Sequence, residues 1–471
     1  MPLLAQEDIT FTVRSPFEEQ YGTPVHEDND GKKHYLIGLS GAALSEFVIY
    51  AWDRWIIDAG WAQTTWEFFL HPENRTPEFD TDWVWTNFVL HPFQGSLYYM
   101  AARNANLNRI ESLIITALGD FTWEWFCETT NPSISDLVYS FFGAFAVGEM
   151  MYRLSLEAEA KCSVLGYIIN PMRIWSDPWM RKKPRGTVGN LHDFSLKVFM
   201  GTTHSYTNSA WEAARTGVER FPLNIVAEAN VVYNDPYGHD SNVPFSQFEL
   251  RFGAGTGPSS GTGRGQSKVE EYIMYNIFIN SNGMLLARAP DWGKNRDTTI
   301  GFVFDYDFRW HSLVDLASLA PGVAIKQRIT YEKSRIEWQA HQCWNILGIT
   351  DNYYIHRDPR KNLLEKERDY DYITGTETVL ALNWLSDRGI LFENIVHFYV
   401  AYDFAAQAHD GLGTGVEFFG FYNCNVEFPV AENIRVGIGN ELYLKKALYT
   451  TEQNVFQIMY AGGVYAKILL K

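Results

Sequence analysis

The chain has 471 residues, of which 39 are basic and 56 acidic, and its formal net charge is −17 at pH 7. This charge excludes a nucleic-acid partner, because the phosphate backbone would be repelled. Aromatic residues make up 15% of the sequence, well above the need of a soluble enzyme of this size. The length allows two or three domains, and the apolar content is ample for a large core.

The first 35 residues are polar and rich in turn formers, which predicts an exposed arm. Met1 to Gln6 lacks a basic region and a complete apolar run. We interpret it as the remnant of a secretory signal that is removed on export; an ordinary cytoplasmic N-terminus is the alternative. The four cysteines show neither metal-ligand spacing nor a disulfide framework, and we expect no metal and no cofactor.

Residues 36–170 are predicted to form a helical region, because apolar residues recur there with a period near 3.6. Two short helices within it end at Leu-His-Pro, at His71 and at His91, since proline disfavours helical geometry in the residue before it. No stretch of about eighteen apolar residues lacks a charge, so we predict no transmembrane helix. The best candidate, 110–127, carries three carboxylates, which are costly in a helix that faces lipid.

A hairpin of two helices over residues 107–153 forms the centre of this region. Polar residues recur at every fourth position of its first helix, so a polar stripe winds along an otherwise apolar helix: Ser112, Thr116, Asp120, Glu124 and Glu128. Small residues form a stripe on the second helix, where another helix can come close: Ser140, Ala144 and Gly148. Ser133, followed three residues later by Asp136, has the form of a capping box and predicts the start of the second helix.

Residues 171–190 hold proline, glycine and a basic cluster, which predicts a linker. The basic cluster fits either a solvated loop or a contact with anionic lipid head groups. Farther on, the glycine-rich stretch 253–265 resembles a phosphate-binding loop but lacks its Lys-Ser/Thr ending, so we expect a flexible connection between strands.

From residue 191 to residue 471 the hydrophobic period changes to two. Apolar Ile300, Phe302 and Phe304, for example, alternate with Gly301, Val303 and Asp305. Twelve alternating segments recur to the end of the chain, near 193–204, 221–233, 245–254, 268–280, 298–310, 321–333, 335–347, 370–384, 389–403, 414–428, 432–446 and 454–470.

Such segments fit strands that cross a membrane. A tilted strand needs about ten alternating residues to cross a bilayer, with apolar side chains outward and polar ones toward the lumen. Strands in soluble proteins average about five or six residues. The even number suits a closed antiparallel barrel, and we predict a transmembrane β-barrel of twelve strands in a bacterial outer membrane. The alternative is a large soluble barrel or a pair of sandwiches.

The helical region also resembles a bacterial envelope family catalogued as domain of unknown function 3943. The resemblance covers about residues 80–155 and is carried by Asn87, His91-Pro92, Gly95, Tyr98, Ala102, Ser112, Trp123-Glu124, Glu128, Pro132-Ser133, Asp136 and Gly148-Glu149. It implies a Gram-negative envelope protein and no established activity.

We expect the helices to fill the lumen as a plug or to brace the barrel from the periplasm, because an empty lumen would leak solutes. The polar stripe would then hydrogen-bond polar lumen residues. The candidate members of this network, or of a ligand site, are Asp120, Glu128, Asp136 and Glu149. A catalytic set is also available from His91 as base, Ser112 as nucleophile and Glu124 as orienting acid.

These features support three hypotheses. The leading one is an outer-membrane barrel protein with a structural, transport or assembly role and no enzymatic activity. The second is an outer-membrane hydrolase or acyltransferase that acts on lipid or lipopolysaccharide through His91, Ser112 and Glu124. The third is a binding module whose helices recruit another envelope protein from the periplasm. Outer-membrane lipids and lipopolysaccharide are the expected partners.

Overall fold

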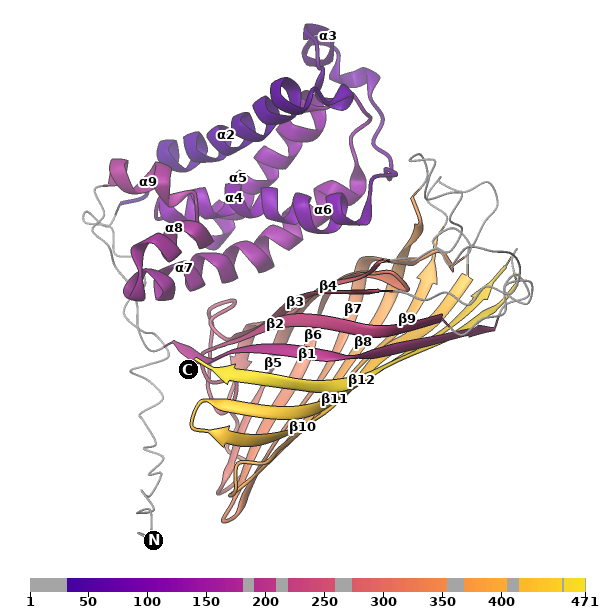
Figure 1. Cartoon of the computed structure of the whole chain (residues 1–471). Coiled ribbons are helices and arrows are strands. Elements are labelled where there is room, and N and C mark those ends of the chain that lie inside the picture. The colour runs from indigo at the N-terminus through magenta and orange to yellow at the C-terminus, as the bar shows by residue number, and fades with distance from the viewer. Residues whose placement is uncertain are drawn as a thin grey trace.

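A computed structural model describes residues 32–180, 190–208, 219–258, 273–353, 368–404, 415–450 and 453–470. A helical domain comes first and a closed antiparallel β-barrel follows it (Figure 1). The predicted fold class is therefore confirmed. Nearly all of the predicted N-terminal arm and the basic residues 181–185 lie outside the described residues.

The helical domain extends to Met180, ten residues beyond the predicted limit of 170. Its longer α-helices are α2 (Tyr35–Ala51), α4 (His91–Asn104), α5 (Arg109–Thr122), α6 (Ile134–Gly143), α7 (Glu149–Lys161), α8 (Ser163–Ile169) and α9 (Arg173–Met180), with the short α3 (Trp66–Leu70). Single turns of π or 3-10 helix join or extend them: η1 (Trp52–Ile57), η2 (Gly60–Ala62), η3 (Pro72–Asn74), η4 (Thr86–Leu90), η5 (Trp123–Cys127) and η6 (Ala144–Gly148). The predicted helix start holds, because the Ser133 hydroxyl accepts from the Asp136 backbone N–H.

The barrel closes where β1 pairs with β12. Its strands are β1 (Leu191–Asn208), β2 (Glu219–Tyr233), β3 (Phe248–Pro258), β4 (Ile273–Arg288), β5 (Arg296–His311), β6 (Val314–Tyr331), β7 (Ser334–Asp351), β8 (Tyr370–Ser386), β9 (Leu391–Asp403), β10 (Gly415–Ala431), β11 (Ile434–Tyr449) and β12 (Val455–Leu469). The predicted number of strands is confirmed. The start of the stretch predicted as a glycine-rich loop, 253–258, belongs to β3, and its remainder lies outside the described residues.

The barrel interior is crossed by its own charged side chains. Arg309 on β5 forms an ion pair with Glu441 on β11, with 2.7 Å between nitrogen and oxygen. Lys445 on β11 reaches Asp351 on β7, and Lys326 on β6 reaches Glu249 on β3. Two interior cavities, of about 100 and 360 Å³, are lined entirely by residues of the strands and of the β2–β3 connection. The helices therefore do not fill these spaces.

An apolar layer also crosses the lumen, near the end of the barrel where β5 turns into β6. Leu313, in that turn, is fully buried, and it clusters with residues from the opposite wall. The cluster contains Leu313, Val314, Leu316, Ile373, Tyr399, Ala401, Phe419, Phe421, Tyr443 and Met459. The tight β5–β6 hairpin thus packs against the opposite wall inside the barrel.

The helical domain packs against the outside of the barrel wall. Asp305 lines an interior cavity, so the alternating neighbours Phe304 and Tyr306 face outward. These outward residues share a buried cluster with Phe88 and Tyr139 of the helical domain. The prediction of a helical plug in the lumen is therefore wrong, because the wall's apolar outer face, not its polar inner face, holds the helices.

The helix pair α6–α7 runs along this wall from one end of the barrel to the other (Figure 1). At one end the Tyr372 hydroxyl, near the start of β8, donates to Ser135 over 2.8 Å. Near the same end, the Tyr139 hydroxyl donates to the carbonyl of Leu347, two residues from Ile349, the strand partner of Tyr372. At the other end Arg153 donates to the carbonyl of Pro244, which lies in the β2–β3 connection. The helical domain therefore contacts the barrel near both of its ends.

Two helical segments are long and apolar enough to cross a membrane: Tyr35–Ile57, with a mean hydropathy of 1.3, and Ile134–Lys161, with 1.2. The sequence analysis expected none, because it required a run without charges. In the folded domain Asp136 pairs with His91, and Glu149 pairs with three arginines. By length and composition, two segments therefore pass where the prediction from the sequence had none.

Close approach of α4 to α6 depends on the small residues that the sequence singled out. A Cβ on Gly95 would lie 2.5 Å from the Ser140 carbonyl oxygen. We expect Gly95→Ala to destabilise the domain by about 1–3 kcal/mol, because the backbone of one helix must move. Thermal unfolding in detergent measures this change. Gly60→Ala is the matched control, since its Cβ would meet nothing within 4 Å. Equal melting temperatures for the two variants would contradict the prediction.

Candidate functional site

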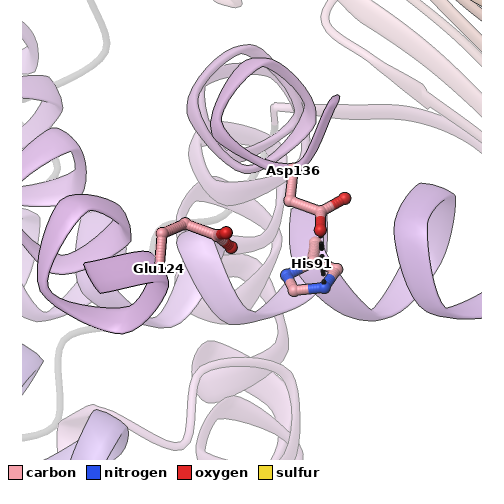
Figure 2. Close-up of side chains that lie close together, drawn as sticks. All are labelled: His91, Glu124 and Asp136. Atoms are coloured by element: carbon pink, nitrogen blue, oxygen red, sulfur yellow. Dashed lines mark ion pairs between the residues drawn. The ribbon is translucent and has the colours of Figure 1, made fainter. Parts of the chain in front are cut away.

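Three buried side chains from three elements converge beside the barrel wall. His91 opens α4, Glu124 lies in η5 and Asp136 lies in the first turn of α6. His91 Nε2 lies 3.4 Å from Asp136 Oδ2, and one ligand atom from each of the three residues lies within 4.8 Å of the others. Figure 2 shows the Glu124 carboxylate pointing toward the pair formed by His91 and Asp136. We call these three residues the His91 cluster.

Local structure fixes each member. The Glu124 carboxylate accepts a hydrogen bond of 2.7 Å from the backbone N–H of Ser133, so it ties the end of η5 to the start of α6. Asp136 follows the residue that caps that helix. His91 lies inside a continuous helical stretch, because η4 leads directly into α4 and both Leu90 and His91 have helical backbone angles. The predicted helix end at His91 is therefore wrong. The cluster therefore lies where the junction of η4 and α4, the π-helical turn η5 and the start of α6 meet.

A second group of polar residues joins this cluster to the barrel. Asn87 donates to Asp80, and the Tyr372 hydroxyl of β8 donates to Asp80 over 3.2 Å and to Ser135 over 2.8 Å. Tyr370, also on β8, donates to the Asp82 carbonyl. Sequence reasoning missed Asp80 and Tyr372. Asp80 lies in an irregular segment without periodicity, and Tyr372 lies in segment 370–384, which was predicted only as a membrane strand.

The surroundings of the cluster are acidic. Burial, and then the nearby Asp80 carboxylate, raise the pKa of Asp82 to about 6. Burial likewise raises the pKa of Glu128, whose two oxygens accept from the Trp123 indole and the Thr130 hydroxyl. Glu128 therefore borders the His91 cluster as an additional carboxylate, and the site as a whole attracts positive charge.

The catalytic set of His91, Ser112 and Glu124 is not brought together. Ser112 and Glu124 belong to one continuous helical stretch and are separated by about 18 Å at 1.5 Å per residue. The Ser112 hydroxyl donates to the Asn108 carbonyl one turn earlier. His91 pairs with Asp136 instead. The structure thus brings His91 and Glu124 together, with Asp136 in place of Ser112 as the third member.

Glu149 forms a separate centre in the helical domain. It is fully buried and lies 2.9–3.0 Å from nitrogen atoms of Arg103, Arg109 and Arg153. The Tyr99 hydroxyl donates to it as well. Glu149 therefore holds α4, α5 and α7 together, and it contacts neither the lumen nor the His91 cluster residues.

The polar stripe of α5 faces the interior of the helical domain. Ser112, Thr116, Asp120 and Glu124 are all buried. On the opposite face Ile110, Ile114 and Leu118 are 71%, 56% and 52% exposed. The helix is thus inverted relative to a helix of a soluble protein, which buries its apolar face.

Comparison with known protein families covers the part of the chain that holds this site. Residues 76–172 match the model described as Domain of unknown function (DUF3943). The predicted resemblance is confirmed, and the matched range is wider than the predicted 80–155. The DUF3943 region contains the His91 cluster, the polar stripe of α5 and Glu149. It spans η4 through α8 and precedes the barrel.

Solved structures are similar only in a general way. Outer membrane phospholipase A from Escherichia coli is 9% identical, with 59% of this chain and 98% of that chain covered and a TM-score of 0.25. A FadL homologue from Pseudomonas aeruginosa is 10% identical, with 64% and 94% covered and a TM-score of 0.25. The outer membrane protease OmpT from Escherichia coli is 10% identical, with 60% and 99% covered and a TM-score of 0.23. The fold assignment rests on the closed strand order of this chain. A search of curated proteins finds no match to the sequence.

Proposed function

We propose that this chain is a bacterial outer-membrane β-barrel protein without an open pore, and that its DUF3943 helices form a lipid-immersed domain on the outside of the barrel wall. The observation that carries the proposal is the inverted α5, with Asp120 and Glu124 inside the domain and Ile114 and Leu118 outside. A helix that meets acyl chains gains by exposing apolar side chains and by keeping its carboxylates away from lipid.

The rest of the domain surface supports the same environment. Large apolar side chains are exposed on several helices: Leu36, Phe47, Val48, Trp52, Trp55, Ile56 and Ile57 on α2 and η1, Val164 and Ile168 on α8, and Ile174 and Trp179 on α9. Soluble proteins rarely expose continuous apolar surface of this extent. The outward residues of the barrel, such as Val198, Phe302 and Val323, are exposed in the same way. Lipid acyl chains, from phospholipid or lipopolysaccharide, are the partner that fits both surfaces.

A structural role in the membrane fits this arrangement better than hydrolysis. Acyl transfer through a serine requires the hydroxyl to be within hydrogen-bond reach of its base. Ser112 instead donates to a backbone carbonyl of its own helix. The geometry therefore supports a scaffold or assembly component that organises lipid beside the barrel.

Photochemical labelling tests the lipid-immersed domain. The full chain is reconstituted into vesicles that contain a phospholipid with a photoreactive acyl chain, and labelled peptides are identified by mass spectrometry. We expect labels on α2 and α5 as well as on the outward residues of the strands, and none on the inward residues of β5 and β11. Labels confined to the strands would contradict the proposal.

The blocked lumen gives a separate prediction. We expect no steady conductance from the wild-type protein in planar bilayers, because Arg309–Glu441 and the apolar layer around Leu313 cross the lumen. A double variant, Arg309→Ala with Leu313→Ser, removes the ion pair with Glu441 and one member of the apolar layer. We expect ions to pass through the lumen of this variant. Stable ohmic steps from the wild type would show an open pore and refute this part of the proposal.

A further inference from the structure

The His91 cluster places one imidazole and two carboxylates around a common point inside the helical domain. Its three ligand atoms lie within 4.8 Å of one another. Around a tetrahedral ion with bonds of about 2.0–2.2 Å to nitrogen and oxygen, the ligand atoms lie about 3.4 Å apart. The ligand atoms would therefore have to approach one another by up to about 1.4 Å, and Figure 2 shows the Glu124 carboxylate pointing toward His91 and Asp136.

The polar atoms of the cluster are not fully satisfied by protein. Asp136 is 2% exposed, and no hydrogen-bond donor among the described residues reaches its Oδ1. Asp80 lies close enough to interact with Asp136 electrostatically, which brings a further carboxylate to the same place. Buried carboxylates are stable when they are paired or bind metal, and an unsatisfied one is costly. A bound cation would supply the partner that Asp136 Oδ1 lacks.

We propose that His91, Glu124 and Asp136 bind one divalent transition-metal ion, of the type of Zn²⁺ or Mn²⁺. A mixed set of imidazole and carboxylate ligands suits these ions, whereas Ca²⁺ and Mg²⁺ prefer oxygen alone. The expectation from the sequence that no metal is bound followed from the four cysteines, which lack metal-ligand spacing, while His91 and Glu124 were assigned to a catalytic set and Asp136 to a polar network or ligand site. This inference goes beyond the proposed function and does not depend on the placement of the helices in lipid.

The position of the site indicates what the ion does. Its ligands come from α4, η5 and α6, so the ion links three elements at the point where the domain meets β8 through Ser135 and Tyr372. All three ligands are buried, which keeps the ion away from bulk solvent, and a set of three protein ligands leaves a fourth position for water or another carboxylate. The ion would fix the hairpin of α5 and α6 against the barrel wall.

Metal analysis of the purified full chain in detergent tests the site. The protein is stripped with a chelator, equilibrated with Zn²⁺ or Mn²⁺, freed of unbound ion and analysed by mass spectrometry for bound metal. We expect about one ion per chain for the wild type. Glu124→Gln and Asp136→Asn each remove a ligand charge and are expected to weaken binding at least about tenfold.

Asp120→Asn is the matched control, because Asp120 is a buried carboxylate of α5 outside the cluster. It is expected to bind metal as the wild type does. A second cluster of the same composition, Asp307, Glu377 and His397, lies in the barrel lumen, so Asp307→Asn is tested in parallel. Added metal should raise the melting temperature of the wild type and of Asp120→Asn, but not of Glu124→Gln, and this comparison needs only that each variant folds.

Three results would overturn the proposal. The wild type could hold no ion after equilibration. Glu124→Gln and Asp136→Asn could bind as tightly as the wild type. Bound metal could disappear in Asp307→Asn and persist in Asp136→Asn, which would move the site to the lumen.

Discussion

Replacing Glu149 by Gln is expected to destabilise the helical domain by about 3–5 kcal/mol, because it removes one partner from a buried set of ion pairs. The carboxylate is fully buried and faces Arg103, Arg109 and Arg153. Without it three guanidinium groups lie close together with no opposing charge. Their mutual repulsion would separate α4, α5 and α7.

Chemical denaturation in detergent, followed by circular dichroism at a helical wavelength, measures this loss. The matched control is Glu73→Gln, which removes an exposed carboxylate that pairs with His71. That variant should be indistinguishable from the wild type, since exposed ion pairs contribute little. An unchanged midpoint for Glu149→Gln would show that the arginines find other partners and that the cluster does not hold the helices together.

A lysine on the exposed face of α5 is the second change with a large expected effect. Leu118 is 52% exposed, so in water Leu118→Lys would be harmless or would improve solubility. In lipid the same change is expected to cost about 3 kcal/mol, the difference between leucine and lysine in the centre of a membrane helix. Leu118→Lys is therefore expected to destabilise the domain if α5 faces lipid, and to leave its stability unchanged or improve its solubility if α5 faces water.

The yield of protein folded into lipid vesicles, read from heat-modifiable gel mobility and from protease resistance of the helical domain, distinguishes them. Leu118→Met controls for the loss of leucine itself and should behave as the wild type. If Leu118→Lys leaves the domain as resistant as Leu118→Met does, α5 faces water and the lipid-immersed domain is wrong.

The barrel could be predicted from the sequence because a bilayer imposes a simple pattern on each strand. Apolar and polar residues must alternate for about ten positions, and β5 with Phe304, Asp305 and Tyr306 shows this pattern directly. The positions where strands begin and end were less well defined. Strand β6 begins at Val314, seven residues before the predicted segment, because its early residues Leu316 and Ala317 are apolar on both faces.

The location of the helices could not be predicted in the same way. A polar stripe on one face of α5 predicts only that this face avoids lipid, and either a lumen or a bundle interior satisfies that requirement. The carboxylates Asp120 and Glu124 disfavour a membrane position for α5 only when the helix is considered in isolation. The packing of α4 and α6 against α5 shields both carboxylates, and no local pattern in the sequence encodes that packing.

The candidate site was predicted in part. His91, Glu124 and Asp136 were all singled out as candidates, but in different roles, and Ser112 was placed with His91 because a serine, a histidine and an acid were available. Helix geometry decides against that set, since residues 112 and 124 lie about 18 Å apart on one helical stretch. Asp80 and Tyr372, which join the site to the barrel, are close only in the folded protein.

Spin-label accessibility at Leu118 tests the central claim most directly. A cysteine is introduced there in a background without the four native cysteines, labelled with a nitroxide and reconstituted into lipid vesicles. The same label at Val323, on the outward face of β6, is the reference for lipid exposure. A lipid-immersed domain predicts that oxygen relaxes both labels strongly and that a water-soluble nickel complex relaxes neither. Strong relaxation by nickel at Leu118, with none at Val323, would place the helical domain in water and contradict the account.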